Sequence, residues 1–301
     1  MDDLQRKILA LKKEKNALIL AHYYQELDIQ EIADVVADSF EMARCAHDAK
    51  EDLLIVCGVR FMAESAKILS PHKTVLLPEK DAGCPMADMI TPEDVIAMRS
   101  QYPDAAVVCY VNTSAAVKAV CDVCCTSSSA EKIVRALPEK RIIFVPDRNL
   151  GAFVAALVPE KEIILFDGCC PIHDRMTEKD VITAKNKHPE ARLLAHPECR
   201  PEVLTRADYI GSTTGIINEA LSSDADEFII GTENEIVNRL KMLAPEKHYY
   251  QLSNDFICPD MKMTRLSSVL NALENGEHEI SLDSRESEAA KKSLERMVSM
   301  G

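Results

Sequence analysis

The sequence carries the same arrangement of residues three times, and this repetition constrains the fold more than any other feature. Cysteine precedes proline at Cys84, Cys170 and Cys258, so the three pairs are separated by 86 and 88 residues. Each pair follows an apolar run that begins with lysine: KTVLLPEKDAGCP, KEIILFDGCCP and KHYYQLSNDFICP. Because each run predicts a buried strand followed by a short loop, the three cysteines occupy equivalent places in three related units.

Two further families of apolar runs share this period, which argues against a chance spacing of the cysteines. One family is ALILAHYYQ, AVVCYVNTS and RLLAHPECR, and the other is DLLIVCGV, RIIFVPDR and EFIIGTEN. A helical pattern follows each run, so one unit is predicted as strand–helix–strand–helix–strand. Strands of the first family end in a polar residue, and a hydroxyl residue follows 17 positions later. These residues are His22, Tyr110 and His196, then Ser39, Ser127 and Thr213.

Alternation of strands and helices predicts an α/β protein with parallel sheets and right-handed connections. Ligands of such sheets bind outside the carboxyl ends of the strands. If the three units pack around a pseudo-threefold axis, their polar strand ends and cysteine loops converge on one central site. The expected division is a first α/β repeat at 1–84, a second at 85–170, a third at 171–258 and a C-terminal segment at 259–301.

The two ends of the chain differ from the repeats. The N-terminal stretch MDDLQRKILALKKEKN is charged throughout and lacks the apolar core of a signal peptide. No run of about 18 apolar residues is present, so no membrane span is expected. Near the C-terminus, Ala290, Leu294 and Met297 fall on one face of a predicted amphipathic helix that packs on the body.

The net charge indicates which partners the chain avoids. It is −14 over 301 residues, with a sequence pI of about 5.1. Such a surface repels nucleic acid and anionic membranes, so we expect small-molecule substrates. Any anionic substrate needs a local site of hydroxyls and helix N-termini, and the three repeated hydroxyl residues are expected to be helix N-caps. We also expect a cytoplasmic location, where the eleven cysteines stay reduced.

Three equivalent cysteines indicate an iron–sulfur cluster better than a zinc site. Structural zinc is closed by four ligands, and the local C-x-x-C pairs of zinc ribbons are absent at these positions. A [4Fe–4S] cluster held at three irons leaves the fourth iron open to act as a Lewis acid on a substrate hydroxyl or carboxylate. The proline after each cysteine restricts the loop that directs the ligand.

The segment CDVCC, residues 121 to 125, is the main competitor for metal or redox chemistry. Cys121 and Cys124 form a C-x-x-C, which is typical of a redox pair or of half a metal site. No matching pair occurs elsewhere, so a structural role is favoured and a redox role stays open. Cys45, Cys57 and Cys109 lie in apolar contexts typical of a core.

The motifs LAHYYQ, CYVNTSAAVKA, GCCPIH, AHPEC, IGSTTGII and CPDMKM follow in order, and with them the chain resembles the quinolinate synthase (quinolinate synthetase A) family. The resemblance runs from about residue 15 to residue 275. It implies three homologous α/β/α sandwiches around a central [4Fe–4S] cluster. It also implies condensation of iminoaspartate (iminosuccinate) with dihydroxyacetone phosphate to quinolinate, phosphate and water in NAD biosynthesis. This is a transferase reaction, linked to the enzyme that makes iminoaspartate.

Carried over position by position, the resemblance assigns a role to each motif residue. Cys84, Cys170 and Cys258 match the cluster ligands. The substrate-contacting positions are His22, Ser39, Tyr110, Val111, Asn112, Ser127, His173, His196, Pro197, Glu198 and Thr213. The catalytic candidates are Tyr24, Glu198, His196, His22 and Tyr110. Two departures remove no proposed ligand: Cys169 stands where tyrosine is frequent, and TSSSA replaces a version with asparagine.

Three other functions remain open from the sequence. A hydro-lyase with an open cluster would remove water from a hydroxy acid without condensation. A non-catalytic redox or metal sensor would use Cys121, Cys124 and Cys125. A tripled sugar-phosphate-binding scaffold without metal would leave the aligned cysteines unexplained. Lys262 either offers its charge to an anion or points into solvent.

Overall fold

The computed structural model describes residues 1–301 and is built from three four-stranded parallel sheets. The sheets have the strand orders β2-β1-β3-β4, β6-β5-β7-β8 and β10-β9-β11-β12, so each unit repeats one topology. The predicted α/β class and the threefold repetition are therefore confirmed. The strands are β1 (Ala17–His22), β2 (Val35–Ala37), β3 (Leu53–Cys57), β4 (Thr74–Leu76), β5 (Ala106–Tyr110), β6 (Val123–Cys125), β7 (Arg141–Val145), β8 (Glu162–Leu165), β9 (Arg192–Ala195), β10 (Tyr209–Ile210), β11 (Glu227–Gly231) and β12 (His248–Gln251).

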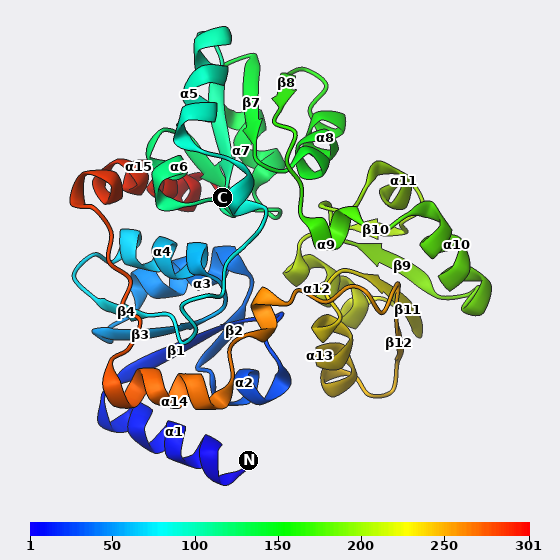
Figure 1. Cartoon of the computed structure of the whole chain (residues 1–301). Helices are drawn as coiled ribbons and strands as arrows, with labels where there is room; N and C mark the ends of the chain where they lie inside the picture. The colour runs from blue at the N-terminus through cyan, green and yellow to red at the C-terminus, as the bar shows by residue number, and fades with distance from the viewer.

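Helices flank each sheet, and Figure 1 shows the three units at the corners of a triangle. None of the helices combines the length and hydrophobicity needed to cross a bilayer. The helices are α1 (Asp3–Glu14), α2 (Leu27–Ile32), α3 (Ser39–Asp48), α4 (Arg60–Leu69), η1 (Ala87–Met89), α5 (Pro92–Gln101), α6 (Ala115–Ala119), α7 (Ala130–Ala136), α8 (Arg148–Leu157), α9 (Pro171–Asp174), α10 (Glu178–Lys187), α11 (Pro201–Leu204), α12 (Thr213–Ser222), α13 (Glu235–Leu243), η2 (Asp260–Lys262), α14 (Leu266–Asn275) and α15 (Ser284–Met300).

The central strands form because their apolar runs are covered on both faces. All five residues of β5 are buried, and its neighbours β6 and β7 pair with it in parallel. A strand of a parallel sheet covered by helices reads as a continuous apolar run, unlike the alternating pattern of a half-exposed strand. The same holds for β1 and β9, which occupy the corresponding place in their sheets.

Each sheet has one strand more than the sequence predicts. The missed strands are the short edge strands β2, β6 and β10, with three, three and two residues. Strands of this length contain too few residues for a pattern of period two, so they read as loops between a strand and a helix. The parallel topology makes each one a continuation of the sheet beyond β1, β5 and β9.

The C-terminal segment returns to the first two units. Helix α14 packs on α1 and β3, whereas α15 packs on α6, β6 and α4, between the first and second sheets (Figure 1). Ala290, Leu294 and Met297 are fully buried, which confirms the predicted amphipathic face. Burial of three such side chains from a single helix contributes several kcal/mol to holding the two units together.

The predicted N-caps are wrong by one position or more. Ser39 and Thr213 are the first residues of α3 and α12, and the caps are Asp38 and Ser212. The cap side chains each accept a backbone N–H of the first turn at 3.2 Å. Ser127 lies three positions before α7 and caps nothing. Because neighbouring residues satisfy the first turn, the predicted hydroxyls are available for other contacts.

Candidate active site at the meeting point of the three units

A cavity of about 240 Å³ lies where the three units meet, and all three cysteines of the Cys-Pro pairs line it. Cys84 is in the loop that joins β4 to η1, and Cys258 lies between β12 and η2. Cys170 is the residue immediately before α9. Each cysteine therefore follows the last strand of its unit and leaves the sheet at its carboxyl end. The sequence predicted that the three cysteines converge, and the structure places all three on the wall of one cavity.

The surroundings of the three thiols disfavour bare thiolates. Burial raises the pKa of Cys84 to about 12 and that of Cys258 to about 11. Burial, followed by the Glu198 carboxylate, also raises the pKa of Cys170. A thiolate at such a position needs a cation beside it, and a metal centre supplies one. The three thiols are therefore suited to binding a metal centre as thiolates.

Glu198 lies at the middle of the polar wall of the cavity. Its carboxylate accepts a hydrogen bond from the Tyr110 hydroxyl at 2.5 Å and lies 2.9 Å from Nδ1 of His173. Burial alone would raise the pKa of this carboxyl, but the neighbouring His173 and His196 and the hydrogen bonds from His173 and Tyr110 outweigh burial and hold the pKa well below its usual range. Ligand atoms of Cys170, His173 and Glu198 lie within 4.8 Å of one another. The ionised carboxylate of Glu198 therefore lies close to the thiol of Cys170.

His22 and His196 occupy equivalent turns of the first and third units. In each case the ring Nδ1 accepts the backbone N–H two residues later, at 3.1 Å from Tyr24 and 3.4 Å from Glu198. Burial lowers the pKa of His22 to about 3 and that of His196 to about 4. Both rings are therefore neutral at pH 7, with the proton on Nε2. In His196 this nitrogen lies 3.2 Å from Oγ of Ser127, in the second unit.

A chain of hydroxyl groups connects the first and third units across the cavity. The Tyr24 hydroxyl lies 3.0 Å from Oγ1 of Thr213 and 2.7 Å from Oγ1 of Thr232. The Thr232 hydroxyl continues to Nε2 of His173 at 3.0 Å. Burial raises the pKa of Tyr24 well above its ordinary value, so its proton stays on the oxygen. Sequence reasoning missed Thr232, although it is the first residue after β11, the kind of strand end that identified the other candidates.

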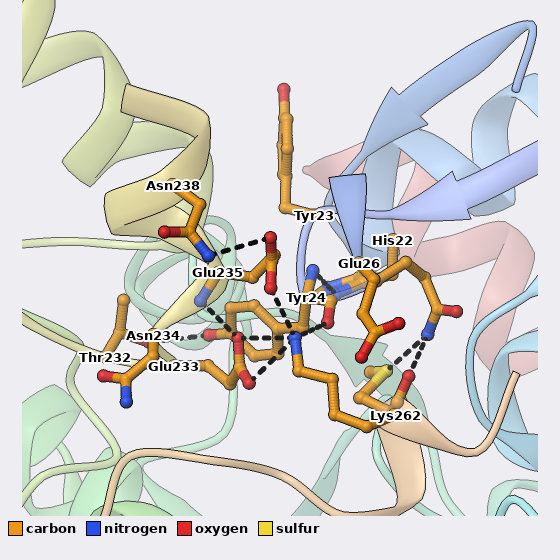
Figure 2. A network of polar contacts seen from close by, with 12 residues as sticks. His22, Tyr23, Tyr24, Glu26, Thr232, Glu233, Asn234, Glu235, Asn238 and Lys262 are labelled. Atoms are coloured by element: carbon orange, nitrogen blue, oxygen red, sulfur yellow. Dashed lines mark hydrogen bonds and ion pairs between the residues drawn. The ribbon is translucent and has the colours of Figure 1, made fainter. Parts of the chain in front are cut away.

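Lys262 lies beside the same wall, and its side chain is only 15% exposed, so the interpretation that it points into solvent is wrong. That it offers its charge to a substrate anion stays a prediction. Figure 2 shows its ammonium group between two units: it donates to the carbonyl of Tyr24 at 2.7 Å and to Oε2 of Glu235 at 3.0 Å. Oε1 of Glu233, whose side chain is 1% exposed, lies 3.2 Å away. The Gln25 side chain donates to the carbonyl of Met261 at 2.7 Å. These contacts join the segment after Cys258 to the first and third units.

Most sequence-predicted substrate positions line the cavity, and two do not. The residues on the wall are His22, Tyr24, Ser39, Tyr110, Asn112, Ser127, His173, His196, Glu198 and Thr213. Val111 and Pro197 are buried but lie outside the lining. Each stands between two lining residues, and alternate residues of an extended segment point to opposite sides. Oδ1 of Asn112 is buried without a hydrogen-bond partner, which leaves one acceptor free at the wall.

The fold and this cavity define a class of protein: an enzyme of three repeated α/β units whose shared cavity can hold a metal centre through cysteines. The chain belongs to the quinolinate synthetase A family, because the family model described as "Quinolinate synthetase A protein" matches residues 6–299. Family membership thus covers all three units and the C-terminal segment.

Curated relatives match over almost the whole chain. A protein of Caldicellulosiruptor saccharolyticus named quinolinate synthase is 54% identical over 300 residues, covering 100% of this chain and 99% of that protein. Quinolinate synthase 2 of Methanosarcina acetivorans is 51% identical over 297 residues, covering 99% of this chain and 96% of that protein. Quinolinate synthase of Clostridium kluyveri is 50% identical over 302 residues, covering 100% of both.

Proposed function

We propose that the chain is a transferase that condenses iminoaspartate with dihydroxyacetone phosphate, giving quinolinate, phosphate and water for NAD biosynthesis. The observation that carries the proposal is the convergence of one cysteine from each unit on a cavity walled by Glu198, His173 and Tyr110. Membership of the quinolinate synthetase A family supports the reaction type.

We assign Cys84, Cys170 and Cys258 as the ligands of a [4Fe–4S] cluster. Three thiols at one cavity can hold three irons and leave one iron open. When bound, this group supplies a Lewis acid that polarises a substrate oxygen and assists loss of water. The remaining chemistry belongs to the side chains around the cavity, none of which is needed as a fourth protein ligand.

The substrates bring two carboxylates and one phosphate into an acidic protein, so they need local donors. Ser39 and Thr213 line the cavity and each begins a ten-residue helix, whose N-terminal end carries partial positive charge. Nε2 of His196 and the hydroxyl of Ser127 add neutral donors from the second and third units. We propose that these groups bind the anionic ends of the substrates without any net positive charge.

Proton transfers fall to the groups around Glu198. The ionised carboxylate accepts a proton, and the Tyr110 hydroxyl that donates to it at 2.5 Å keeps it aimed at the cavity. Tyr24 holds its proton firmly and can donate it to a leaving or developing oxyanion. Thr232 and His173 continue the chain from Tyr24 and can replace that proton.

The supply of iminoaspartate implies a functional link to the enzyme that makes it, because an imine hydrolyses in water. We place both steps in the cytoplasm, a compartment that keeps eleven cysteines reduced. No nucleic acid or membrane partner is part of the proposal.

Anaerobic purification followed by two assays tests the proposed function. We expect bound iron and sulfide, a broad visible absorption band, and quinolinate only when iminoaspartate and dihydroxyacetone phosphate are both present. Dehydration of a hydroxy acid without dihydroxyacetone phosphate would point to a hydro-lyase and contradict the proposal. Iron-free protein from a strictly oxygen-free preparation would contradict the cluster.

A further inference from the structure

The three sheets share one topology, but the free edges of their last strands are treated differently. Each of β4, β8 and β12 has a neighbouring strand on one side only. In the first unit the chain itself covers this edge. The N–H of Ile280 donates to the carbonyl of Val75 at 2.9 Å, and the N–H of Leu77 donates to the carbonyl of His278 at 3.2 Å. No other segment pairs with the free edges of β8 and β12.

A lysine accompanies the covered edge of the first unit. Nζ of Lys67 on α4 lies 3.4 Å from Oε1 of Glu279, the residue opposite β4 in this antiparallel bridge. The register of β3 with β4 matches that of β11 with β12, so each residue of the third unit follows its equivalent by 174 positions. The equivalent of Lys67 is therefore Lys241 on α13, whereas the second unit has Ala155 there. The third unit thus keeps the lysine but lacks the acidic segment that pairs with it.

A recess of about 360 Å³ lies along the free edge of β12, between α10 and α13. Two exposed lysines line it, Lys187 at the end of α10 and Lys241 on α13. None of the lining residues is acidic, although the chain carries a net charge of −14. Because opposite charges attract across an interface, the recess favours an acidic ligand.

The backbone of β12 presents hydrogen-bonding groups to this recess. The N–H groups of His248 and Leu252 donate toward β11. Successive residues of a strand direct their backbone groups to opposite sides, so the carbonyl of Tyr249 and the N–H of Gln251 point away from the sheet. These two groups are the equivalents of the carbonyl and the N–H that bind residues 278–280 in the first unit. The free edge therefore has the acceptor and the donor that an added strand needs.

Two aromatic side chains complete the recess. Tyr249 is 3% exposed, and its hydroxyl is buried without a hydrogen-bond partner among the lining residues. A buried hydroxyl without a partner costs free energy, and a ligand carboxylate that accepts its proton would recover this cost. On the α10 side, the ring of His188 stacks on that of Tyr250 with centroids 3.4 Å apart. This pair forms a flat wall for an apolar side chain of the ligand.

We propose that the free edge of β12 binds a short acidic strand of a partner protein by strand addition. Main-chain hydrogen bonds to Tyr249 and Gln251 hold the strand, and its carboxylates lie beside Lys187 and Lys241. The expected pattern is that of residues 277–280, Glu-His-Glu-Ile, which has two acidic residues two positions apart and then an apolar residue. Pairing of β12 with β12 of a second copy is disfavoured, because it brings the lysines of both recesses together. The proposal does not rest on the proposed function.

A labelled peptide of residues 276–283, GEHEISLD, tests the mode of binding. Fluorescence anisotropy with the full-length protein, purified without oxygen, should show saturable binding. Methylation of the peptide nitrogen that corresponds to Ile280 should weaken binding about tenfold, because it removes the donor to the strand. Methylation at the position of Glu279, whose N–H points away from the strand, is the matched control and should change the affinity less than about twofold. Absence of saturable binding, or equal losses with both peptides, would overturn the proposal.

Protein variants and hydrogen exchange test the location. Lys241→Glu and Lys187→Glu should each weaken peptide binding about tenfold, because repulsion replaces attraction. Lys179→Glu makes the same charge change on α10 outside the recess and should leave the affinity unchanged. The peptide should slow amide exchange in residues 248–252 and leave residues 74–77 unchanged.

Three results would overturn the proposal. Protection of residues 74–77 alone would show that the peptide only displaces the segment that covers β4. Release of the peptide by an equal concentration of inorganic phosphate would assign the recess to a small anion. A concentration-dependent dimer that protects residues 248–252 without the peptide would assign the edge to a second copy of the chain.

Discussion

The chain contains two groups of three cysteines, and the two groups differ in where their members lie in the fold. Cys84, Cys170 and Cys258 come from different units and stand in loops on the wall of a cavity. Cys109, Cys121 and Cys124 form the second group and lie within the second unit, where Cys109 and Cys124 are directly opposite each other on the adjacent strands β5 and β6. Only the first group repeats along the sequence, so repetition distinguishes cysteines that serve a shared centre from cysteines that serve one unit.

Position relative to the cavity separates the two groups further. The first group faces the Glu198 carboxylate, and with burial this keeps its thiols protonated until a metal arrives. Cys109 and Cys124 are fully buried within the second unit and lie outside the cavity. Cysteine reactivity follows such surroundings more closely than it follows exposure alone. Metal binding is therefore expected from the first group and a structural role from the second.

Replacing the cysteines one at a time gives the largest expected difference between the groups. Cys84→Ser, Cys170→Ser or Cys258→Ser should each reduce iron and turnover to background, because each removes one of the three proposed ligands. Cys121→Ser and Cys124→Ser should retain iron at the wild-type ratio. Iron counts and visible spectra of anaerobic preparations measure this. Loss of iron in Cys121→Ser or Cys124→Ser would contradict this distinction between the two groups.

Replacing Glu198 tests whether the carboxylate beside the first group does chemistry or only maintains structure. Glu198→Gln keeps the shape and should retain iron, but turnover should fall roughly a hundredfold or more, because the base is lost. Glu235→Gln, a nearby carboxylate that bonds Lys262 outside the cavity wall, is the matched control. Near-normal turnover in Glu198→Gln would remove this residue from the mechanism.

Acid should weaken the region of the first group through its neutral histidines. The folded pKa values of His22 and His196, about 3 and about 4, lie below the ordinary value of 6.5, so the unfolded chain binds more protons between these values. Stability should thus fall as pH drops from 7 to 5, by about 2 kcal/mol for each ring. Urea unfolding of metal-free protein measures this.

His22→Asn should flatten that pH dependence, and substitution of the exposed His47 should leave it unchanged. An unaltered slope in His22→Asn would show that the ring is not held neutral by burial.

The smallest expected effect concerns how the third ligand loop is held. Lys262→Met removes the contacts with Tyr24 and Glu235 and should lower kcat/KM about tenfold, because small displacements of catalytic groups are costly. Lys262→Arg should retain more of the wild-type kcat/KM than Lys262→Met does. The Lys247 ammonium donates to the carbonyls of Ala220 and Ser223 within one unit. Lys247→Met is therefore a control that should change stability but not kcat/KM. Equal losses in both variants would contradict a positioning role.

The sequence predicted the strands and loops that repeat along the chain, but it missed the side-chain contacts between units. The strands carrying His22, Tyr110 and His196, the three cysteine loops and the final helix all follow from local patterns. The contacts of Lys262 with Tyr24 span 238 residues, and no local pattern reports them.

The cysteines of CDVCC illustrate the same limit. Spacing singled out Cys121 and Cys124 as a C-x-x-C pair, but it could not report that Cys124 lies opposite Cys109 on the neighbouring strand β5. Edge strands of two or three residues were missed for a related reason, since their pairing partner decides their conformation and their own composition does not. Tertiary neighbours therefore supplied the information that the sequence pattern lacked.

The position of α15 has a consequence for biosynthesis. This helix ends at Met300 and packs between the first and second units, and Cys258 also lies in the last part of the chain. Domains of a nascent polypeptide generally fold in order of synthesis. Here α15 can join the first two units only after residues 284–300 have been made, and a cofactor that needs all three thiols can be bound only after Cys258 has been made.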